Sequence, residues 1–279
     1  MLGAGGIGGL LAAALARSGA PVVLLLRDET LAAYPGRLVV RSAVLGDFEA
    51  DVAATSVLDA DVDVVWVAVK ATGLEAALAL APPARVGDAT VIPLLNGIDH
   101  VDHLRARYRT VVAGAIRVES ERVPPATIVQ RSPFVAVELA GAPGAAADLR
   151  DAGIACSVRD DERSLMWEKL AFLAPAALAT TALGASLGAV REDPRFAAAR
   201  EEAFAVARAE GATIDELALA SLHDRAPEGM RSSMQKDVEA GREPELDAIA
   251  GPILRGGRRH GIPVPATEEL AAVVRARAG

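Results

Sequence analysis

The sequence contains a single cysteine, Cys156, in 279 residues. One thiol excludes an intrachain disulfide and a cysteine-rich metal site, and we expect no bound metal. Such sparing use of cysteine suits a reducing compartment, so we expect a cytoplasmic protein. Basic residues are also few: 29 lysines and arginines face 37 acidic residues, for a net charge of −8. This balance argues against general binding of nucleic acid or of a lipid surface, but a small anionic ligand needs only a local positive site.

Two kinds of hydrophobic targeting segment are also missing. Residues 1–16 carry no charged side chain, so the basic region of a signal peptide is absent and we expect none. Leu170–Val190 is 21 residues without a charge, which is long enough to span a membrane. It consists mostly of alanine, glycine, threonine and serine, with Pro175 inside, and such a segment inserts poorly. We expect a buried pair of small-residue helices there, and no membrane.

Short apolar runs alternate with helix-like runs in the first half of the chain. The hydrophobic fraction of 52% is enough for a packed core, and the length suggests about two domains. Apolar runs of this kind suit strands buried on both faces of a parallel sheet, and the alternation predicts βαβ units in a doubly wound sheet. The predicted strands are Val22–Leu26, Val64–Val69, Thr90–Leu95 and Phe134–Leu139, and the predicted helices are Ile7–Ser18, Thr72–Ala81 and Val101–Tyr108.

The second half has a different pattern, without a convincing strand from Arg163 onward. The predicted helices are Phe196–Gly211, Leu246–His260 and Thr267–Ala278, and Thr213–Glu216 resembles a capping box at another helix start. We therefore predict an α/β domain over residues 1–160 and an all-helical domain over residues 161–279.

A glycine-rich segment near the start fits the dinucleotide-binding pattern G-x-G-x-x-G. It comprises Gly3, Ala4, Gly5, Gly6, Ile7 and Gly8. The first glycine allows a tight turn, the second lets the backbone approach a pyrophosphate, and the third lets the helix pack closely on the sheet. A strand should precede this loop, yet only Met1 and Leu2 do. Three explanations stay open: a different start, a truncation, or a protein that uses a two-residue stub.

Charged and amide side chains follow three of the predicted strands. Arg27 and Asp28 come after Leu26; an acidic residue here typically binds the ribose of NAD, whereas an arginine favours the 2′-phosphate of NADP. Because Arg27 comes first, we expect NADPH as the cofactor. Lys70 and Asn96 end the next two strands, where ligands bind in open α/β sheets. An ordinary surface lysine and an Asn-Gly turn are the alternatives.

Two further segments carry candidate catalytic groups. Lys169 adjoins the uncharged helical stretch, where desolvation can lower a lysine pKa and make the group a proton donor; a snorkelling lysine is the alternative. The segment from Ser232 to Glu245 supplies hydroxyls, an amide and carboxylates within fourteen residues. Without other information it would also fit a polar helix face followed by a loop.

Taken together and in this order, these segments resemble the ketopantoate reductase family. The matches are the glycine loop, Arg27, Val-Lys70, Leu-Asn96-Gly97, Trp-Glu-Lys169-Leu, Ser-Ser-Met-Gln-Lys-Asp followed by Gly-Arg-Glu-Pro-Glu245, and Gly261-Ile-Pro-Val-Pro265. The resemblance implies a Rossmann-type N-terminal domain, a helical C-terminal domain and an active site in the cleft. NADPH would reduce 2-dehydropantoate to pantoate.

The resemblance also implies a role for each matched residue. Lys169 would be the general acid, and Glu245 would hold the substrate hydroxyl and orient the lysine. Asn96 and Ser233 would contact the substrate or its carboxylate, and Asn96 would also contact the cofactor. Lys70 would lie beside the nicotinamide, and Arg27 would bind the 2′-phosphate. Reduction of a ketone needs such a set: a hydride donor, a proton donor and charge stabilisation at the oxyanion.

The chain departs from the family at two positions after the lysine. Family members carry asparagines one and two helical turns on, where this sequence has Leu173 and Ala177. A pocket that no longer hydrogen-bonds a hydroxyl discriminates less against substrates lacking it, so a more apolar 2-oxo acid is a candidate substrate. A β-hydroxyacid dehydrogenase-like enzyme and a non-catalytic dinucleotide sensor are the alternatives. A homodimer is compatible with the sequence.

Overall fold

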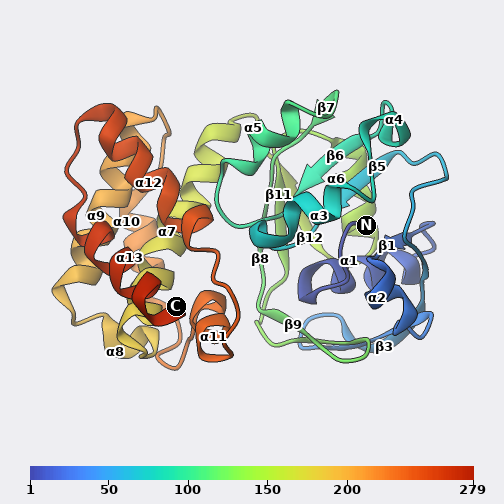
Figure 1. Ribbon diagram of the computed structural model, residues 1–279, viewed down its shortest axis with the longest axis horizontal. Helices are drawn as coiled ribbons and strands as arrows, with labels where there is room; N and C mark the ends of the chain where they lie inside the picture. The colour runs from blue at the N-terminus through green and yellow to red at the C-terminus, as the bar shows by residue number, and fades with distance from the viewer. The chain divides into compact units, whose positions relative to one another are not determined.

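The computed structural model describes residues 1–279 and divides into two compact units. The first unit comprises residues 1–95 and 100–162, and the second comprises residues 96–99 and 163–279. The first contains all the strands and the second is helical, which confirms the predicted fold class (Figure 1). The short segment Asn96–Asp99 groups with the helical unit, although the strand that precedes it belongs to the other.

A parallel sheet forms the centre of the first unit. Its strands are β1 (Val23–Leu25), β4 (Ala53–Thr55), β5 (Val64–Val67), β6 (Thr90–Pro93) and β7 (Thr110–Val111). β1 pairs with β4, and β5 with β6 and β6 with β7, all in parallel. Leu2 bridges Leu25 on one side and Val67 on the other, also in parallel. The two-residue stub thus takes the place of the central strand, and the strand order becomes β4-β1-Leu2-β5-β6-β7.

Both faces of this sheet are covered. In β5, Trp66 packs into one hydrophobic cluster while Val65 and Val67 pack into another on the opposite side. Strands buried on both faces need apolar side chains at every position, which is why their sequences are continuous runs. The helical segments of this unit are α1 (Gly6–Arg17), α2 (Asp28–Ala32), η1 (Ala71–Gly73), α3 (Leu74–Leu78), α4 (Pro83–Val86), α5 (His100–Arg105) and α6 (Pro143–Asp151).

Seven further strands form two smaller sheets. One has the order β3-β2-β10-β9, from β2 (Arg37–Ser42), β3 (Gly46–Asp51), β9 (Ser120–Val123) and β10 (Thr127–Gln130). The other has the order β12-β11-β8, from β8 (Gly114–Arg117), β11 (Ala136–Leu139) and β12 (Ala155–Val158). The run Phe134–Leu139 was expected in the parallel sheet, but β11 pairs antiparallel with β8 and parallel with β12. Apolar content alone does not specify strand direction, so that expectation was wrong.

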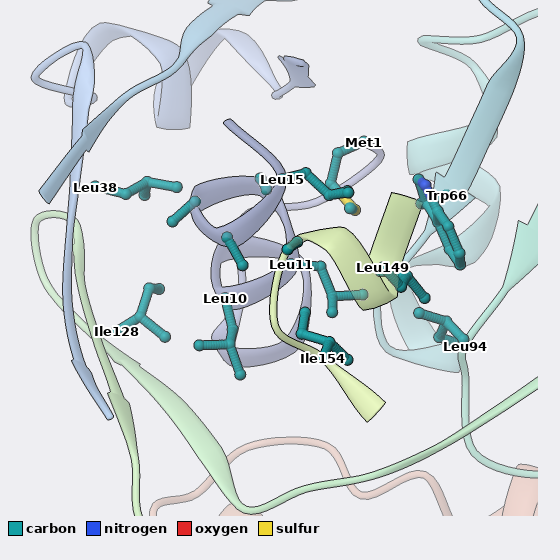
Figure 2. Packing of buried hydrophobic residues seen from close by; sticks show 14 of the residues in the cluster. Met1, Leu10, Leu11, Leu15, Leu38, Trp66, Leu94, Ile128, Leu149 and Ile154 are labelled. Carbon is teal, nitrogen blue, oxygen red and sulfur yellow. The ribbon is translucent and has the colours of Figure 1, made fainter. Parts of the chain in front are cut away.

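Helix α1 lies in the middle of this packing. Figure 2 shows Leu10 and Leu11 projecting from the helix among side chains from several elements, including Ile128 of β10 and Leu149 of α6. Leu10 and Leu11 are fully buried. Because α1 is enclosed in this way, the start of the helix, and with it the glycine loop, is held in one position.

The second unit is a bundle of seven helices. They are α7 (Glu162–Leu183), α8 (Leu187–Val190), α9 (Pro194–Ala209), α10 (Glu216–Arg225), α11 (Ser233–Glu239), α12 (Leu246–His260) and α13 (Pro265–Ala278). The uncharged stretch Leu170–Val190 forms most of α7 and all of α8 and is largely buried, as predicted. No helix combines the length and the apolar character that crossing a membrane would require.

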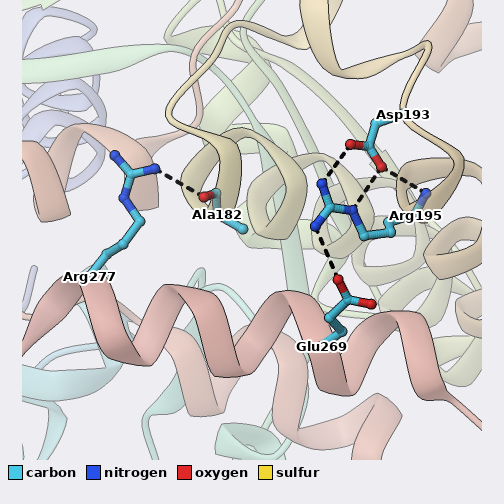
Figure 3. A network of polar contacts seen from close by, with 5 residues as sticks. All are labelled: Ala182, Asp193, Arg195, Glu269 and Arg277. Carbon is cyan, nitrogen blue, oxygen red and sulfur yellow. Dashed lines mark hydrogen bonds and ion pairs between the residues drawn. The ribbon is translucent and has the colours of Figure 1, made fainter.

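Aspartates cap two of these helices. The side chain of Asp193 accepts from the backbone N–H of Arg195 at the start of α9, and Arg195 bridges Asp193 and Glu269 of α13 (Figure 3). Hydrogen bonds from the side chain and the backbone N–H of Arg195, with a smaller contribution from its charge, lower the pKa of Asp193 to about 2. At α10 the cap is Asp215, whose carboxylate accepts from Ala218 N, so the capping box predicted at Thr213 was wrong. Asp215 and Thr213 are both good N-cap residues, and sequence alone did not choose between them.

Candidate functional site

Three sequence-predicted residues follow three neighbouring positions of the parallel sheet. Gly3 follows Leu2, Arg27 follows β1, and Lys70 follows β5. Because these strands are parallel and adjacent, their carboxyl ends meet at one edge, which is where ligands bind in open α/β sheets. The structure therefore gathers the glycine loop, Arg27 and Lys70 at a single edge of the first unit.

The glycine loop has the geometry that a pyrophosphate requires. Gly3 has a φ of +90°, and a Cβ on Gly8 would lie 2.1 Å from the carbonyl oxygen of Gly3. A Cβ on Gly5, by contrast, would meet no atom within 4 Å. Gly5 caps α1 without any side-chain hydrogen bond to the first N–H groups of the helix. The loop thus presents open space and an uncapped helix N-terminus, which suit an anionic phosphate.

The surroundings of the remaining loop residues and of Arg27 also suit an anionic phosphate. A Cβ on Gly6 would lie 2.2 Å from the carbonyl oxygen of Ser120, whose hydroxyl donates to Gly6 O across 2.8 Å. Ala4 is buried and Ile7 packs against the core, so both support the loop from within. The side chain of Arg27 is exposed and forms no ion pair within the chain. It is therefore available to a phosphate at the end of β1.

The other predicted polar residues lie in the helical unit, and a hydrogen bond joins two of them. The side-chain amide of Asn96 donates to Glu245 Oε2 across 3.1 Å. Glu245 precedes α12 and is 6% exposed, and Lys169 of α7 is 7% exposed. Next to Asn96, Gly97 has a φ of +83°, and a Cβ on it would lie 2.2 Å from the carbonyl oxygen of Ala248 in α12. The Asn-Gly pair is thus packed tightly against the start of α12, which fixes Asn96 beside Glu245.

The two serines of the Ser-Ser-Met motif have different surroundings. Ser232 is buried, accepts from Gln235 N as the cap of α11, and contacts the Thr180 hydroxyl at 2.9 Å. Ser233 is exposed and is the first residue of α11. Only Ser233 therefore presents a hydroxyl that is accessible to a small molecule.

Sequence reasoning assigned no role to Asp237 and Arg242, which hold α11 to the loop that leads to Glu245. Asp237 is 2% exposed, and its Oδ1 accepts from Arg242 Nε across 2.9 Å. The backbone N–H of Arg242 donates to Asp237 O across 2.8 Å. The signal that could have identified them is their five-residue spacing around Gly241, whose φ of +64° ends the helix with a turn.

Leu173 and Ala177 are both part of the apolar surface of α7. Leu173 is half-buried and packs against the core of the helical unit, and Ala177 is 1% exposed. Neither side chain can donate or accept a hydrogen bond. The two turns of α7 after Lys169 therefore carry no polar side chain at Leu173 or Ala177.

Lysine is rare in this chain, and its rarity is a further signal for a catalytic amine. Of the 29 basic residues in the chain only three are lysines: Lys70, Lys169 and Lys236. Arginine supplies almost every other positive charge, and it cannot lose its proton in a protein. Because a lysine can, the rare lysines of this chain are the candidates for proton transfer, and Lys169 is the buried one. No group of three or more metal-ligating side chains is present.

A glycine-loop sheet unit joined to a helical unit with a buried lysine and glutamate is the architecture of a class of two-unit oxidoreductases. The chain belongs to the ketopantoate reductase family, because the model described as "Ketopantoate reductase PanE/ApbA" matches residues 1–140 and its C-terminal counterpart matches residues 161–278. This confirms the resemblance read from the motifs.

Individual proteins that are similar to this chain support the same family. A 2-dehydropantoate 2-reductase of Mycobacterium tuberculosis is 31% identical over 220 residues, which cover 75% of this chain and 74% of the relative. A PanE/ApbA family ketopantoate reductase structure from Ralstonia eutropha is 29% identical with a TM-score of 0.87, covering 99% of this chain and 97% of that one. A D-mandelate dehydrogenase in complex with NADH and anilino(oxo)acetate shares the fold at 23% identity, with a TM-score of 0.88 and coverage of 99% and 97%.

Proposed function

We propose that this protein reduces a 2-oxo acid to the corresponding 2-hydroxy acid with NADPH. The observation that carries the proposal is the polar group of the helical unit, in which Asn96 donates to the buried Glu245 and the buried Lys169 is the only enclosed amine among three lysines. Oxidoreduction of the 2-dehydropantoate 2-reductase type is supported by the curated relatives.

The cofactor proposal rests on the edge of the parallel sheet. NADPH supplies the hydride when it is bound. The glycine loop from Gly3 to Gly8 would hold its pyrophosphate, and Arg27 would pair with its 2′-phosphate. Lys70, at the end of β5, would lie by the nicotinamide. The exposed and unpaired guanidinium of Arg27 supports NADPH over NADH.

The proton-transfer proposal assigns a separate role to each buried group. Lys169 would donate its proton to the carbonyl oxygen of the substrate as the ketone carbon accepts hydride, leaving a neutral amine. Glu245, oriented by Asn96, would accept a hydrogen bond from the substrate and keep the lysine in place. Ser233, whose hydroxyl is exposed, would contact the substrate carboxylate.

The substrate proposal follows from the apolar turns after the lysine. Leu173 and Ala177 offer no hydrogen bond, so the pocket would favour a branched 2-oxo acid without a hydroxyl over 2-dehydropantoate. Each buried CH₂ of such a substrate contributes about 0.8 kcal/mol. The paired Glu245 carboxylate remains available for a hydroxyl, so 2-dehydropantoate is the comparison substrate in the test.

The test is NADPH consumption by the purified protein with a panel of 2-oxo acids, read at the absorbance of the reduced nicotinamide. We expect turnover with branched 2-oxo acids that is absent for aldehydes and for 3-hydroxy acids with NADP⁺. Oxidation of a 3-hydroxy acid would instead indicate a β-hydroxyacid dehydrogenase. Tight NADPH binding without turnover of any compound would indicate a sensor and would overturn the proposal.

A further inference from the structure

His223 of α10 is a completely buried imidazole that the proposed reaction does not use. Its exposed fraction is zero. The ring stacks on Phe172 of α7 with a centroid distance of 4.6 Å and an interplanar angle of 11°, and it meets Phe196 of α9 edge-on at 5.2 Å. Arg191 Nε donates to the backbone carbonyl of His223 across 3.0 Å, which fixes the end of α10. The imidazole is thus held from the backbone and from both aromatic neighbours.

The single hydrogen bond of the ring shows which nitrogen carries the proton. His223 Nε2 lies 2.7 Å from the carbonyl oxygen of Phe172. A carbonyl can only accept, so Nε2 carries the proton. Nδ1 is buried without a partner. Burial lowers the pKa of His223, and the charges of Arg191 and Arg200 act in the same direction, against the attraction of Asp224 and the Phe172 carbonyl. The ring is therefore the neutral Nε2–H tautomer at neutral pH.

A phenylalanine would pack at this position without leaving an unpaired nitrogen. What the histidine adds is the single N–H that is directed at Phe172 O. The carbonyl in question lies in the turn of α7 that Pro175 disturbs. Proline has no N–H, so the carbonyl of Ala171 loses its helical donor, and the ring crowds that turn. The N–H of His223 supplies a donor to the neighbouring carbonyl, in the turn where the proline removes one helical hydrogen bond.

Lys169 lies on α7 only three residues before Phe172, and Leu173 follows directly. The turn that His223 holds is therefore the turn that positions the proposed proton donor and the apolar surface beside it. Small displacements of such a group are expensive, since a misplacement of about 1 Å can lower a rate by roughly 10²-fold. We propose that His223 is a positioning residue for Lys169, which acts by holding the carbonyl of Phe172 through its Nε2–H. This inference rests on the proposed role of Lys169.

The experiment compares three substitutions in the full-length protein. His223→Phe keeps an aromatic ring but loses the donor, His223→Gln places an amide N–H near the position of Nε2, and His223→Asn places it near Nδ1. We expect His223→Phe and His223→Asn to lower kcat by about tenfold or more. The Kd for NADPH should stay unchanged, because the glycine loop belongs to the other unit. His223→Gln should recover most of kcat.

Amine labelling gives a readout that does not depend on turnover. The chain has only three lysines, so the labelling rate of each can be followed by peptide mass spectrometry, with Lys70 and Lys236 as internal references. Relative to these two, Lys169 should label faster in His223→Phe than in the native protein and in His223→Gln. Circular dichroism and the melting temperature show whether each variant is folded.

Each outcome has one interpretation. Native kcat and native Lys169 labelling in His223→Phe would overturn the inference. If kcat falls equally in the Phe and Gln variants and their melting temperatures fall equally, His223 contributes only packing. That result would also overturn the inference. If the native protein reduces no 2-oxo acid, the proposed function fails, and the labelling pattern still decides whether His223 positions the amine.

Discussion

The amide of Asn96 and the carboxylate of Glu245 are joined by a 3.1 Å hydrogen bond, although 149 residues separate them in the chain. Asn96 follows the end of β6, yet it groups with the helical unit because Gly97 packs against the backbone of α12. The carboxylate just before α12 is thereby paired with a residue that lies shortly after a strand. Any change at Asn96 therefore acts on Glu245.

Replacing Asn96 tests this pair. In Asn96→Asp a second carboxylate faces Glu245, and like charges this close repel, so we expect a larger loss of kcat/KM than in Asn96→Ala. Removing the Asn96 donor from the buried carboxylate in Asn96→Ala should cost about 1–3 kcal/mol in the free energy of unfolding. Urea unfolding and steady-state kinetics measure the two effects. Glu245→Gln should relieve the defect of Asn96→Asp, and additive losses would show that the two residues act independently.

Lys169 is tested by removing its amine and, separately, by replacing the amine with a guanidinium that keeps the positive charge. Lys169→Ala should lower kcat by roughly 10²–10⁴-fold, the usual contribution of general acid catalysis. Lys169→Arg should be impaired to a similar degree, because a guanidinium does not give up its proton. The Kd for NADPH, measured by quenching of tryptophan fluorescence, should be unchanged in both. Near-native turnover in either variant would contradict the assignment.

Two glycines of the loop should separate cofactor binding from stability. A Cβ at Gly5 enters open space and its backbone is unstrained, so Gly5→Ala should fold normally but weaken NADPH binding by about tenfold, or ~1.4 kcal/mol. A Cβ at Gly8 collides with Gly3 O, so Gly8→Ala should lower the free energy of unfolding by about 1–3 kcal/mol. Titration with NADPH and urea unfolding measure the two quantities. The reverse pattern would place the pyrophosphate elsewhere.

Arg27 tests the proposed preference for NADPH. Arg27→Ala should weaken NADPH by about 1.5–3 kcal/mol, the range for a hydrogen bond to a charged group, and should leave NADH almost unaffected. Arg85→Ala, which removes an exposed arginine of α4, is the matched control for net charge. Fluorescence titration with each cofactor measures the difference. Equal weakening of both cofactors would assign Arg27 a structural role and direct attention to Asp28.

Leu173 tests the substrate proposal. Leu173→Asn should shift the ratio of kcat/KM values toward 2-dehydropantoate, relative to a branched 2-oxo acid without a hydroxyl, by about tenfold, the effect of one hydrogen bond of roughly 1.4 kcal/mol. Leu173→Ala removes the apolar side chain without adding an amide and should not produce this shift. A native enzyme that already prefers 2-dehydropantoate strongly, with no change in the asparagine variant, would mean that Leu173 only packs.

The longest helices and the apolar strands β1, β5 and β6 could be predicted because their patterns are local. Leu246–His260 has the same bounds in the sequence and in the structure, and α1 begins and ends one residue before the predicted helix. The strands β2, β3, β9 and β10 gave no such signal. β3, for instance, is Gly-Asp-Phe-Glu-Ala-Asp, whose three acidic residues lie on an exposed edge that pairs only with β2. Its strand conformation comes from this pairing rather than from apolar residues.

The sequence by itself determined the order of the motifs, the glycine loop, the family and the identity of the candidate proton donor. Only the tertiary structure showed that Asn96 belongs with Glu245, that Ser232 is a buried cap while Ser233 is exposed, and that His223 holds a carbonyl of α7. The reason is physical. Hydrophobic periodicity and turn-forming residues act over a few neighbouring positions, so they can be recognised in the sequence. A hydrogen bond between side chains far apart in the chain forms only when packing has removed both from water and brought them together.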